Sequence, residues 1–253
     1  MKKLKKLVVG NWKMNPPSIE EVKSLANKVK RGALNIKRIQ VVVCPPFVYL
    51  GTLSNFSNSK QLFLGAQDAF YEPIGHFTGE VSFSQLPDFK TSFVILGHSE
   101  RRAIGESDNI INKKVRAVVG EGMTVILCVG EKVRDHSGEY LGIVKKQIID
   151  GLKDIPKKSL DRVVIAYEPI WAVGSREAMH PREIHEMSIF IKKVLREMYG
   201  MPADGVRILY GGDVTPDNVL EIVRDGNVSG VLVGRESLKP KGFVEIIKIV
   251  DSI

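Results

Sequence analysis

Residues 163–171 read Val-Val-Ile-Ala-Tyr-Glu-Pro-Ile-Trp, and this stretch decides the fold. Its first five residues are apolar and include three β-branched side chains, without polar alternation. Such a run is typical of a strand buried on both faces, as in a parallel sheet. The run ends abruptly at Glu168, which a proline follows. The stretch therefore predicts a buried parallel strand that presents a carboxylate at its carboxyl end.

Seven further apolar runs of this kind lie at residues 6–10, 40–44, 62–66, 93–97, 124–129, 206–210 and 230–234. The intervals between them carry helix signals. Ser18 and Glu21 match a capping box, and Pro181 and Pro216 look like first-turn prolines. Eight βα units predict a closed eight-stranded parallel (β/α)8 barrel that occupies residues 1–253 as a single domain. An open, doubly wound sheet is the alternative, because counting runs does not prove closure.

The composition is that of a globular protein, with 253 residues of which 43% are hydrophobic and 26% charged. The formal charge is +8 and the pI about 9.4. The lysines are scattered except near the two ends, and no aromatic residues interleave with a basic stripe, so we expect no nucleic-acid partner. The apolar run at residues 7–9 is too short for a signal peptide and no segment reaches transmembrane length, so we expect no membrane partner. Cys44 and Cys128 sit in apolar runs and are interpreted as buried hydrophobes of a reducing compartment, which predicts a cytoplasmic protein.

Side chains able to do chemistry follow the ends of several runs. In a (β/α)8 barrel these ends converge on one mouth, where the active site lies. A cation, a histidine, a carboxylate and two glycine-bearing loops would meet there around one ligand, and the glycines would let backbone N–H groups approach an anion. The residues concerned are Asn11, Lys13, Gln67, Asp68, His98, Glu168, Gly211, Gly212, Asp213, Gly234 and Arg235.

The three most reactive of these residues also have ordinary structural interpretations. Lys13 could be a solvated lysine, His98 a satisfied structural histidine and Glu168 a surface acid; only their joint placement favours a catalytic site. Other catalytic patterns are absent from the sequence: there is no nucleotide-binding glycine motif, no serine nucleophile elbow and no cluster of Cys and His. His180 and His185 are five apart, which does not place them together as helical zinc ligands. We therefore expect no metal and no cofactor.

The sequence around these residues resembles the triosephosphate isomerase family, in family order and over nearly the whole chain. The resemblance implies a TIM barrel and a cofactor-independent isomerase of glycolysis and gluconeogenesis, acting on D-glyceraldehyde 3-phosphate and dihydroxyacetone phosphate. The matching motifs are Gly10-Asn11-Trp12-Lys13-Met14-Asn15, Ala66-Gln67, Phe77-Thr78-Gly79-Glu80, Gly97-His98-Ser99-Glu100-Arg101-Arg102, Cys128-Val129-Gly130-Glu131, Ala166-Tyr167-Glu168-Pro169-Ile170-Trp171-Ala172, Tyr210-Gly211-Gly212 and Leu232-Val233-Gly234.

The resemblance implies a role for each site residue, following the family's recognised mechanism. Glu168 would be the base that removes a carbon-bound proton, His98 a neutral electrophile at the carbonyl, and Lys13 a positive charge near the substrate. The other implied residues are Asn11, Gly174, Asp213, Gly234 and Arg235, which would bind substrate with Lys13, and Glu100, Ser99 and Tyr210, which would support catalysis.

Four places depart from the family pattern, three of them in the part that grips phosphate. Asp68 stands where asparagine is usual, and Asp213 where serine is usual. Residues 174–177 read Gly-Ser-Arg-Glu instead of Gly-Thr-Gly-Lys, and residues 234–237 read Gly-Arg-Glu-Ser instead of Gly-Gly-Ala-Ser. A carboxylate at position 213 would oppose phosphate, so it either points away and contributes only its N–H or is compensated by its neighbours. We favour compensation, in which Asp213 caps the following helix and pairs with Arg235 or Arg176 from the neighbouring loops.

The family resemblance also bears on assembly and motion. It implies that residues 71–80 insert into a neighbouring subunit of a homodimer and bring Thr78 near its Asn11 and Glu100, and the apolar side chains of this loop favour such burial. Residues 170–179 would close over the substrate. Two alternatives to an active isomerase remain: a non-catalytic or altered phosphate-binding barrel used as a binding or scaffold protein, motivated by the changed loops, and another phosphosugar barrel enzyme.

Overall fold

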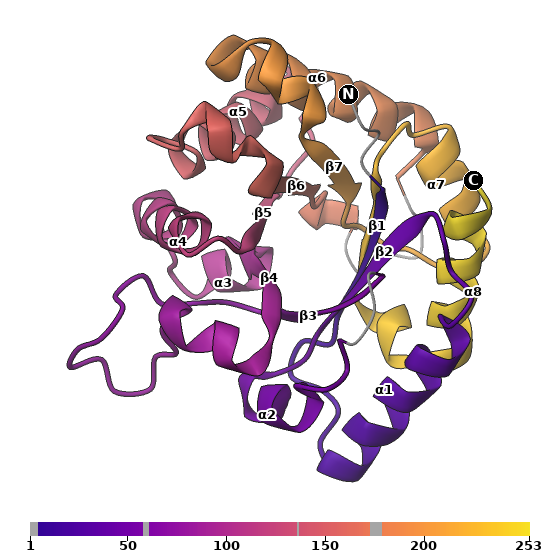
Figure 1. Ribbon diagram of the computed structural model, residues 1–253. Coiled ribbons are helices and arrows are strands. Elements are labelled where there is room, and N and C mark those ends of the chain that lie inside the picture. The colour runs from indigo at the N-terminus through magenta and orange to yellow at the C-terminus, as the bar shows by residue number, and fades with distance from the viewer. Residues whose placement is uncertain (1–4, 58–60, 136, 173–178) are drawn as a thin grey trace.

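The computed structural model describes residues 5–57, 61–135, 137–172 and 179–253, and its centre is a closed barrel of parallel strands (Figure 1). Each strand pairs with the next in chain order, and β8 returns to β1. The strands are β1 (Lys6–Asn11), β2 (Ile39–Cys44), β3 (Leu62–Ala66), β4 (Thr91–Leu96), β5 (Thr124–Val129), β6 (Val163–Tyr167), β7 (Arg207–Tyr210) and β8 (Gly230–Val233). The predicted (β/α)8 barrel is confirmed, and the open sheet is excluded.

The predicted runs match these strands to within two residues at either end. The largest difference is at β4, which begins at Thr91 rather than at Phe93 and ends at Leu96 rather than at Gly97. Gly97 has a φ of +67°, a left-handed conformation in which the extended chain cannot continue. The turn at this glycine directs the next residue, His98, across the mouth of the barrel.

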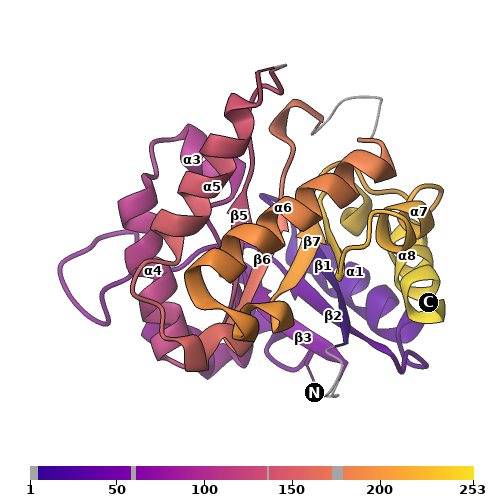
Figure 2. The same cartoon turned by 90° about the horizontal axis from the view of Figure 1, so that it is seen from above.

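Helices surround the barrel and cover the outer face of its strands (Figures 1 and 2). The α-helices are α1 (Ile19–Gly32), α2 (Leu50–Leu53), α3 (Ser99–Ala103), α4 (Asp108–Gly120), α5 (Glu139–Gly151), α6 (Pro181–Tyr199), α7 (Val219–Arg224) and α8 (Pro240–Ser252). Short 3-10 helices lie at η1 (Phe47–Tyr49), η2 (Phe83–Phe89), η3 (Lys157–Arg162), η4 (Ile170–Ala172), η5 (Met201–Gly205) and η6 (Arg235–Leu238).

The local helix signals were mostly correct. Ser18 caps α1: its Oγ accepts the backbone N–H of Glu21 at 3.3 Å and donates to the Glu21 carboxylate at 3.1 Å. Pro181 is the first residue of α6, as expected. Pro216 is not in a first helical turn, since α7 begins three residues later, at Val219, after a non-helical turn.

Apolar side chains form two layers on either side of the strands. The larger layer fills the space between the strands and the helices, and the smaller one fills the inside of the barrel. Both cysteines, Cys44 and Cys128, belong to the inner layer and are fully buried free thiols, as expected. Burial raises the pKa of both thiols, so neither is an activated thiolate.

The described helices include none with the length and apolar character needed to cross a bilayer.

Candidate active site

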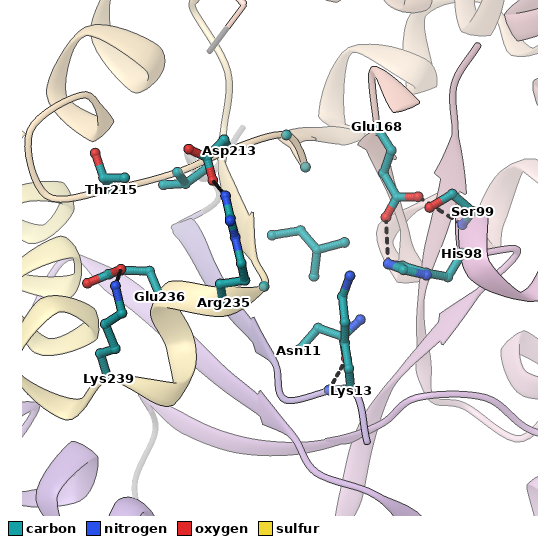
Figure 3. A pocket seen from close by; sticks show the side chains of 15 residues that line it. Asn11, Lys13, His98, Ser99, Glu168, Asp213, Thr215, Arg235, Glu236 and Lys239 are labelled. Carbon is teal, nitrogen blue, oxygen red and sulfur yellow. Dashed lines mark hydrogen bonds and ion pairs between the residues drawn. The ribbon is translucent and has the colours of Figure 1, made fainter. Parts of the chain in front are cut away.

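The carboxyl ends of the strands surround a pocket of about 390 Å³ that brings most of the predicted site residues together (Figure 3). Its walls come from the ends of β1, β4, β6, β7 and β8 and from the loops that follow them. The lining residues are Asn11, Lys13, His98, Ser99, Glu168, Gly211, Gly212, Asp213, Val214, Thr215, Leu232, Gly234, Arg235, Glu236 and Lys239.

Glu168 follows β6 and is buried, with 3% of its surface exposed, so the surface-acid interpretation is wrong. One carboxylate oxygen, Oε2, accepts the backbone N–H of Ser99 at 3.0 Å, and Oε1 lies 3.2 Å from Nε2 of His98. Two glycines make room for this residue. A Cβ on Gly211 would lie 2.9 Å from Cγ of Glu168, and a Cβ on Gly130 would lie 1.8 Å from its backbone oxygen. The apolar strand and these glycines thus place a desolvated carboxylate at the barrel mouth.

His98 is the N-cap residue of α3, and its ring is held in one tautomer. Its Nδ1 accepts the backbone N–H of Glu100 at 3.2 Å, so Nδ1 carries no proton and the imidazole is neutral with its proton on Nε2. That Nε2–H faces the Glu168 carboxylate. The ring is therefore set to donate a hydrogen bond into the pocket without being a cation.

Lys13 has a backbone φ of +51°, a conformation that side-chain-bearing residues rarely adopt. Two contacts hold it there: its N–H donates to Oδ1 of Asn11 at 2.9 Å, and its carbonyl accepts from Nε2 of Gln67 at 2.8 Å. Its ammonium group reaches Oε1 of Glu100 at 2.7 Å. Backbone strain kept in place by such contacts is typical of functional positions, and here it aims a cation at the pocket.

The far side of the pocket carries an ion pair between the loops that follow β7 and β8, both of which depart from the family pattern. Nη2 of Arg235 lies 2.9 Å from Oδ1 of Asp213, which confirms the predicted pairing with Arg235 (Figure 3). The predicted helix cap is wrong, because Asn218 is the N-cap residue of α7. Asn218 instead bonds the loop itself, accepting from the N–H of Thr215 and donating to the carbonyl of Asp213. The Asp213 side chain therefore pairs with Arg235 and does not cap the helix.

Four residues predicted for the site are outside the pocket lining: Gln67, Asp68, Glu100 and Tyr210. Glu100 is mostly exposed and contributes by holding Lys13. Tyr210 is fully buried at the end of β7, beneath Gly212, and burial raises the pKa of its phenol to about 12. Gly174 lies outside the described residues, together with Arg176 and most of the segment expected to close.

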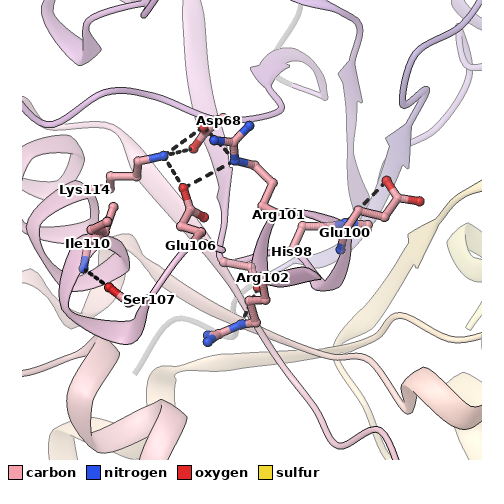
Figure 4. A network of polar contacts seen from close by, with 10 residues as sticks. Asp68, His98, Glu100, Arg101, Arg102, Glu106, Ser107, Ile110 and Lys114 are labelled. Atoms are coloured by element: carbon pink, nitrogen blue, oxygen red, sulfur yellow. Dashed lines mark hydrogen bonds and ion pairs between the residues drawn. The ribbon is translucent and has the colours of Figure 1, made fainter. Parts of the chain in front are cut away.

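Helix α3 connects the site to a charged network that sequence reasoning did not find (Figure 4). The network has two carboxylates and two cations: Lys114 bonds both Asp68 and Glu106, and Arg101 of α3 contacts the same two carboxylates. The Lys114 side chain is only 3% exposed. The adjacent Arg102 donates to the carbonyl of Gly97 at 2.7 Å. These contacts fix the helix whose first residues hold Glu168 and Lys13.

Behind Glu168 lies a second carboxylate that was not singled out. Glu131 is fully buried, and its Oε1 accepts from the hydroxyl of Tyr167 at 2.8 Å and from the indole N–H of Trp171 at 2.9 Å. Its only sequence signal was membership of the Cys128-Val129-Gly130-Glu131 motif. Glu236 and Lys239 of the pocket were also missed, because they lie three and six residues beyond the end of β8, where no local pattern marks an ion pair.

In the part of the chain that the structure describes, no three His, Cys, Asp or Glu side chains gather as they would around a metal ion.

Comparison with known proteins agrees with this geometry. A sequence model of the family described as triosephosphate isomerase matches residues 6–250. The chain is similar to proteins named triosephosphate isomerase from Roseiflexus sp. (strain RS-1), with 41% identity over 95% of this chain and 96% of that protein. Those of Thermodesulfovibrio yellowstonii (40% identity, 96% and 99%) and Endomicrobium trichonymphae (38%, 96% and 98%) are similarly related. A family match over residues 6–250 on a closed parallel barrel, with five of the family's motifs contributing to one pocket, shows that the chain belongs to the triosephosphate isomerase family.

Proposed function

We propose that this protein interconverts D-glyceraldehyde 3-phosphate and dihydroxyacetone phosphate by proton transfer through an enediolate, as a step of glycolysis and gluconeogenesis. The observation that carries the proposal is the buried carboxylate of Glu168, which faces a neutral His98 at 3.2 Å in a pocket that also holds Lys13. A base, a hydrogen-bond donor and a cation at one mouth suit proton abstraction next to a carbonyl.

Glu168 is the base in this proposal. It takes a proton from one of the two reacting carbons of the substrate and returns it to the other, which leaves the carboxylate unchanged at the end of the cycle. Burial supports the role, because it keeps the carboxylate out of bulk water at the mouth of the barrel, where the substrate would meet it. The Ser99 N–H and the His98 ring now satisfy its oxygens, so substrate must take the place of at least one of these contacts.

His98 and Lys13 stabilise the charge that develops on the substrate oxygens. The His98 Nε2–H is fixed by the backbone hydrogen bond at Nδ1 and can donate to the enediolate oxygen. Lys13 supplies positive charge, with Asn11 ordering its backbone. Preorganised donors of this kind cost no rearrangement during the reaction, and removing one typically slows the chemical step on the order of 10²-fold or more.

The phosphate is assigned to the opposite end of the pocket, between the loops that follow β7 and β8. Asp213, Gly234 and Arg235 line that end, and the first N–H groups of a helical turn such as η6 have no partner within their own turn. Binding energy gained at this remote group orients the reacting carbons. Gly174 and the closing segment belong to the same proposal but lie outside the described residues.

The proposal includes a cytoplasmic homodimer. The connection from β3 to β4 projects from the barrel rim (Figure 1), with Ile74 88% and Phe77 43% exposed. Tyr71 is less exposed than expected, because it stacks on Phe70 and lies under the ammonium group of Lys113. Two large apolar side chains on a protruding loop support burial in a second copy. Sedimentation at micromolar concentration should give twice the chain mass, and a fully active monomer would exclude the dimer.

The altered, non-catalytic barrel remains the second candidate, because the cations that line the described pocket are all paired. Lys13, Arg235 and Lys239 each contact a carboxylate. A coupled assay with D-glyceraldehyde 3-phosphate separates the two functions: the isomerase turns it over and loses activity in Glu168→Ala, whereas a binding protein retains a phosphate ligand without turnover in either form.

A further inference from the structure

Arg134 makes an unusual set of contacts close to the site. Its guanidinium carbon lies 4.8 Å from the centre of the Tyr140 ring and 6.0 Å from the centre of the Trp171 ring. One of its nitrogens contacts the Tyr140 hydroxyl at 3.5 Å, and another lies 3.8 Å from the sulfur of Met179. Arg134 therefore contacts residues on both sides of 173–178, one before that segment and one after it.

Within the described ranges, no carboxylate pairs with Arg134. None of the ion pairs within 4.0 Å between described residues includes Arg134, although its chain neighbour is Asp135. Asp135 is used elsewhere: its carboxylate accepts the backbone N–H groups of Glu139 and Tyr140, each at 2.9 Å, and so ties this loop to the start of α5. The arginine is held in place beside Tyr140, and its guanidinium meets aromatic faces, which attract a cation.

Trp171 links Arg134 to the end of β6, which Glu168 follows. The Arg134 guanidinium lies over the Trp171 ring. The Trp171 indole N–H donates to the buried carboxylate of Glu131 at 2.9 Å. The hydroxyl of Tyr167, the residue before Glu168, bonds the same oxygen at 2.8 Å. Burial and the Glu131 carboxylate raise the pKa of Tyr167, whereas the Arg134 guanidinium lowers it. The charge of Arg134 therefore acts on the end of β6.

The backbone ties the same segments together. The N–H of Glu168 donates to the carbonyl of Val129 at 2.8 Å, and the N–H of Ile170 donates to the carbonyl of Glu131 at 3.0 Å. Residues 168–171 are thus joined to residues 129–131 by two backbone bonds and by the Trp171 side chain. The backbone bonds do not depend on residue type, whereas the orientation of the indole depends on what lies against its exposed side. Trp171 is 38% exposed, and Arg134 is the cation that lies against its ring.

We propose that Arg134 is a positioning residue for the catalytic base: its guanidinium holds the Trp171 indole on Glu131 and thereby fixes the strand end that carries Glu168. The proposal rests on the proposed isomerase function for its kinetic consequence, but its structural consequence at Trp171 is independent of activity. Arginine suits the position because its planar group stacks on two rings, which the compact ammonium of lysine does less well.

The test compares Arg134→Met, which keeps the apolar stem, with Arg134→Lys, which keeps the charge, and with Lys132→Met as the matched control. Lys132 is an exposed cation two residues away that makes none of these contacts. Acrylamide quenching of tryptophan fluorescence reports the exposure of Trp171, with a Trp171→Phe variant as the blank for the fully buried Trp12. Steady-state kinetics give kcat and KM for each variant, and thermal melts show that each is folded.

Arg134→Met should increase the quenching of Trp171 and lower kcat about three- to tenfold, with KM changed less than about twofold, on the order expected from losing a cation–π contact. Arg134→Lys should recover part of both effects, and Lys132→Met should match the wild type. Unchanged quenching in Arg134→Met, or increased quenching with an unchanged kcat, would overturn the proposal, as would a fall in melting temperature alone. If the wild type shows no isomerase activity, the proposed function fails, and the quenching result still decides whether Arg134 holds Trp171.

Discussion

Removing Arg235 should weaken substrate binding because it leaves the Asp213 carboxylate unpaired at the end of the pocket that we propose for the phosphate. The two side chains are 2.9 Å apart, and both line the pocket. A carboxylate about 5 Å from a phosphate charge opposes it by about 3 kcal/mol at an effective dielectric constant near 20, and by less than 1 kcal/mol in bulk water. Because the Arg235 side chain is 67% and the Asp213 side chain 25% exposed, the real value lies between these limits.

We therefore expect Arg235→Ala to raise KM at least about fivefold, since about 1 kcal/mol corresponds to that factor. Asp213→Ser should change KM by less than about tenfold, because it frees an arginine while removing a carboxylate that was already neutralised. The double variant should return toward the wild-type KM. Lys241→Ala, which removes an exposed cation outside the pocket lining, is the matched control for net charge.

The assay is the coupled isomerase reaction at low and at moderate salt, supplemented by the inhibition constant of inorganic phosphate. The KM difference between Arg235→Ala and the wild type should shrink as salt rises, because exposed charges are screened. If Arg235→Ala leaves KM unchanged while Asp213→Ser tightens binding by much more than tenfold, the carboxylate is uncompensated in the native protein, and the electrostatic reasoning is refuted.

Three further changes test other parts of the structure. Lys13→Met should abolish most activity and weaken phosphate inhibition without lowering the melting temperature; retained affinity for phosphate would show that Lys13 is not an anion contact. Lys114→Met leaves two nearly buried carboxylates without their shared ammonium group and should cost about 3–5 kcal/mol of unfolding free energy in a denaturant titration; a loss below 1 kcal/mol would contradict the role given to the network. Burial lowers the pKa of Arg207 to about 10, and its side chain bonds the neutral Gln40 at 2.7 Å. Gln40→Glu should therefore raise the melting temperature, because it supplies a carboxylate to the buried guanidinium. A lower melting temperature would show that burying the added carboxylate costs more free energy than the ion pair contributes.

Much of the fold could be predicted because its signals are local. Apolar runs, most of them rich in β-branched residues, marked all eight strands, and Ser18 and Pro181 marked helix starts through local signals within a few residues. Closure could not be predicted in this way, because it depends on the pairing of β8 with β1, more than two hundred residues apart. The cap expected at Asp213 failed for a related reason: the chain first makes a turn that Asn218 stabilises.

In the candidate site, too, local signals could be predicted and contacts between distant segments could not. Glu168, His98 and Lys13 were found because each follows a strand or belongs to a family motif. The residues that hold them were not found, because their contacts join distant segments. Lys114 and Glu131, for example, were recognisable only as a helix lysine and a motif glutamate until the fold placed them beside their partners. The choice of Arg235 as partner of Asp213 likewise required the geometry of the two loops.

Solvent exchange during turnover tests the central claim most directly. With D-glyceraldehyde 3-phosphate in D2O, the wild type should give dihydroxyacetone phosphate that carries deuterium at the carbon that accepts the proton, since a base that holds the proton between two carbons can exchange it with solvent. Glu168→Asp should slow the reaction on the order of 10²-fold, because it withdraws the carboxylate by about one bond length. Glu168→Ala should slow it further, and any residual product should carry deuterium taken directly from solvent. Near-wild-type turnover by Glu168→Ala, prepared free of host isomerase, would contradict the assignment of Glu168 as the base.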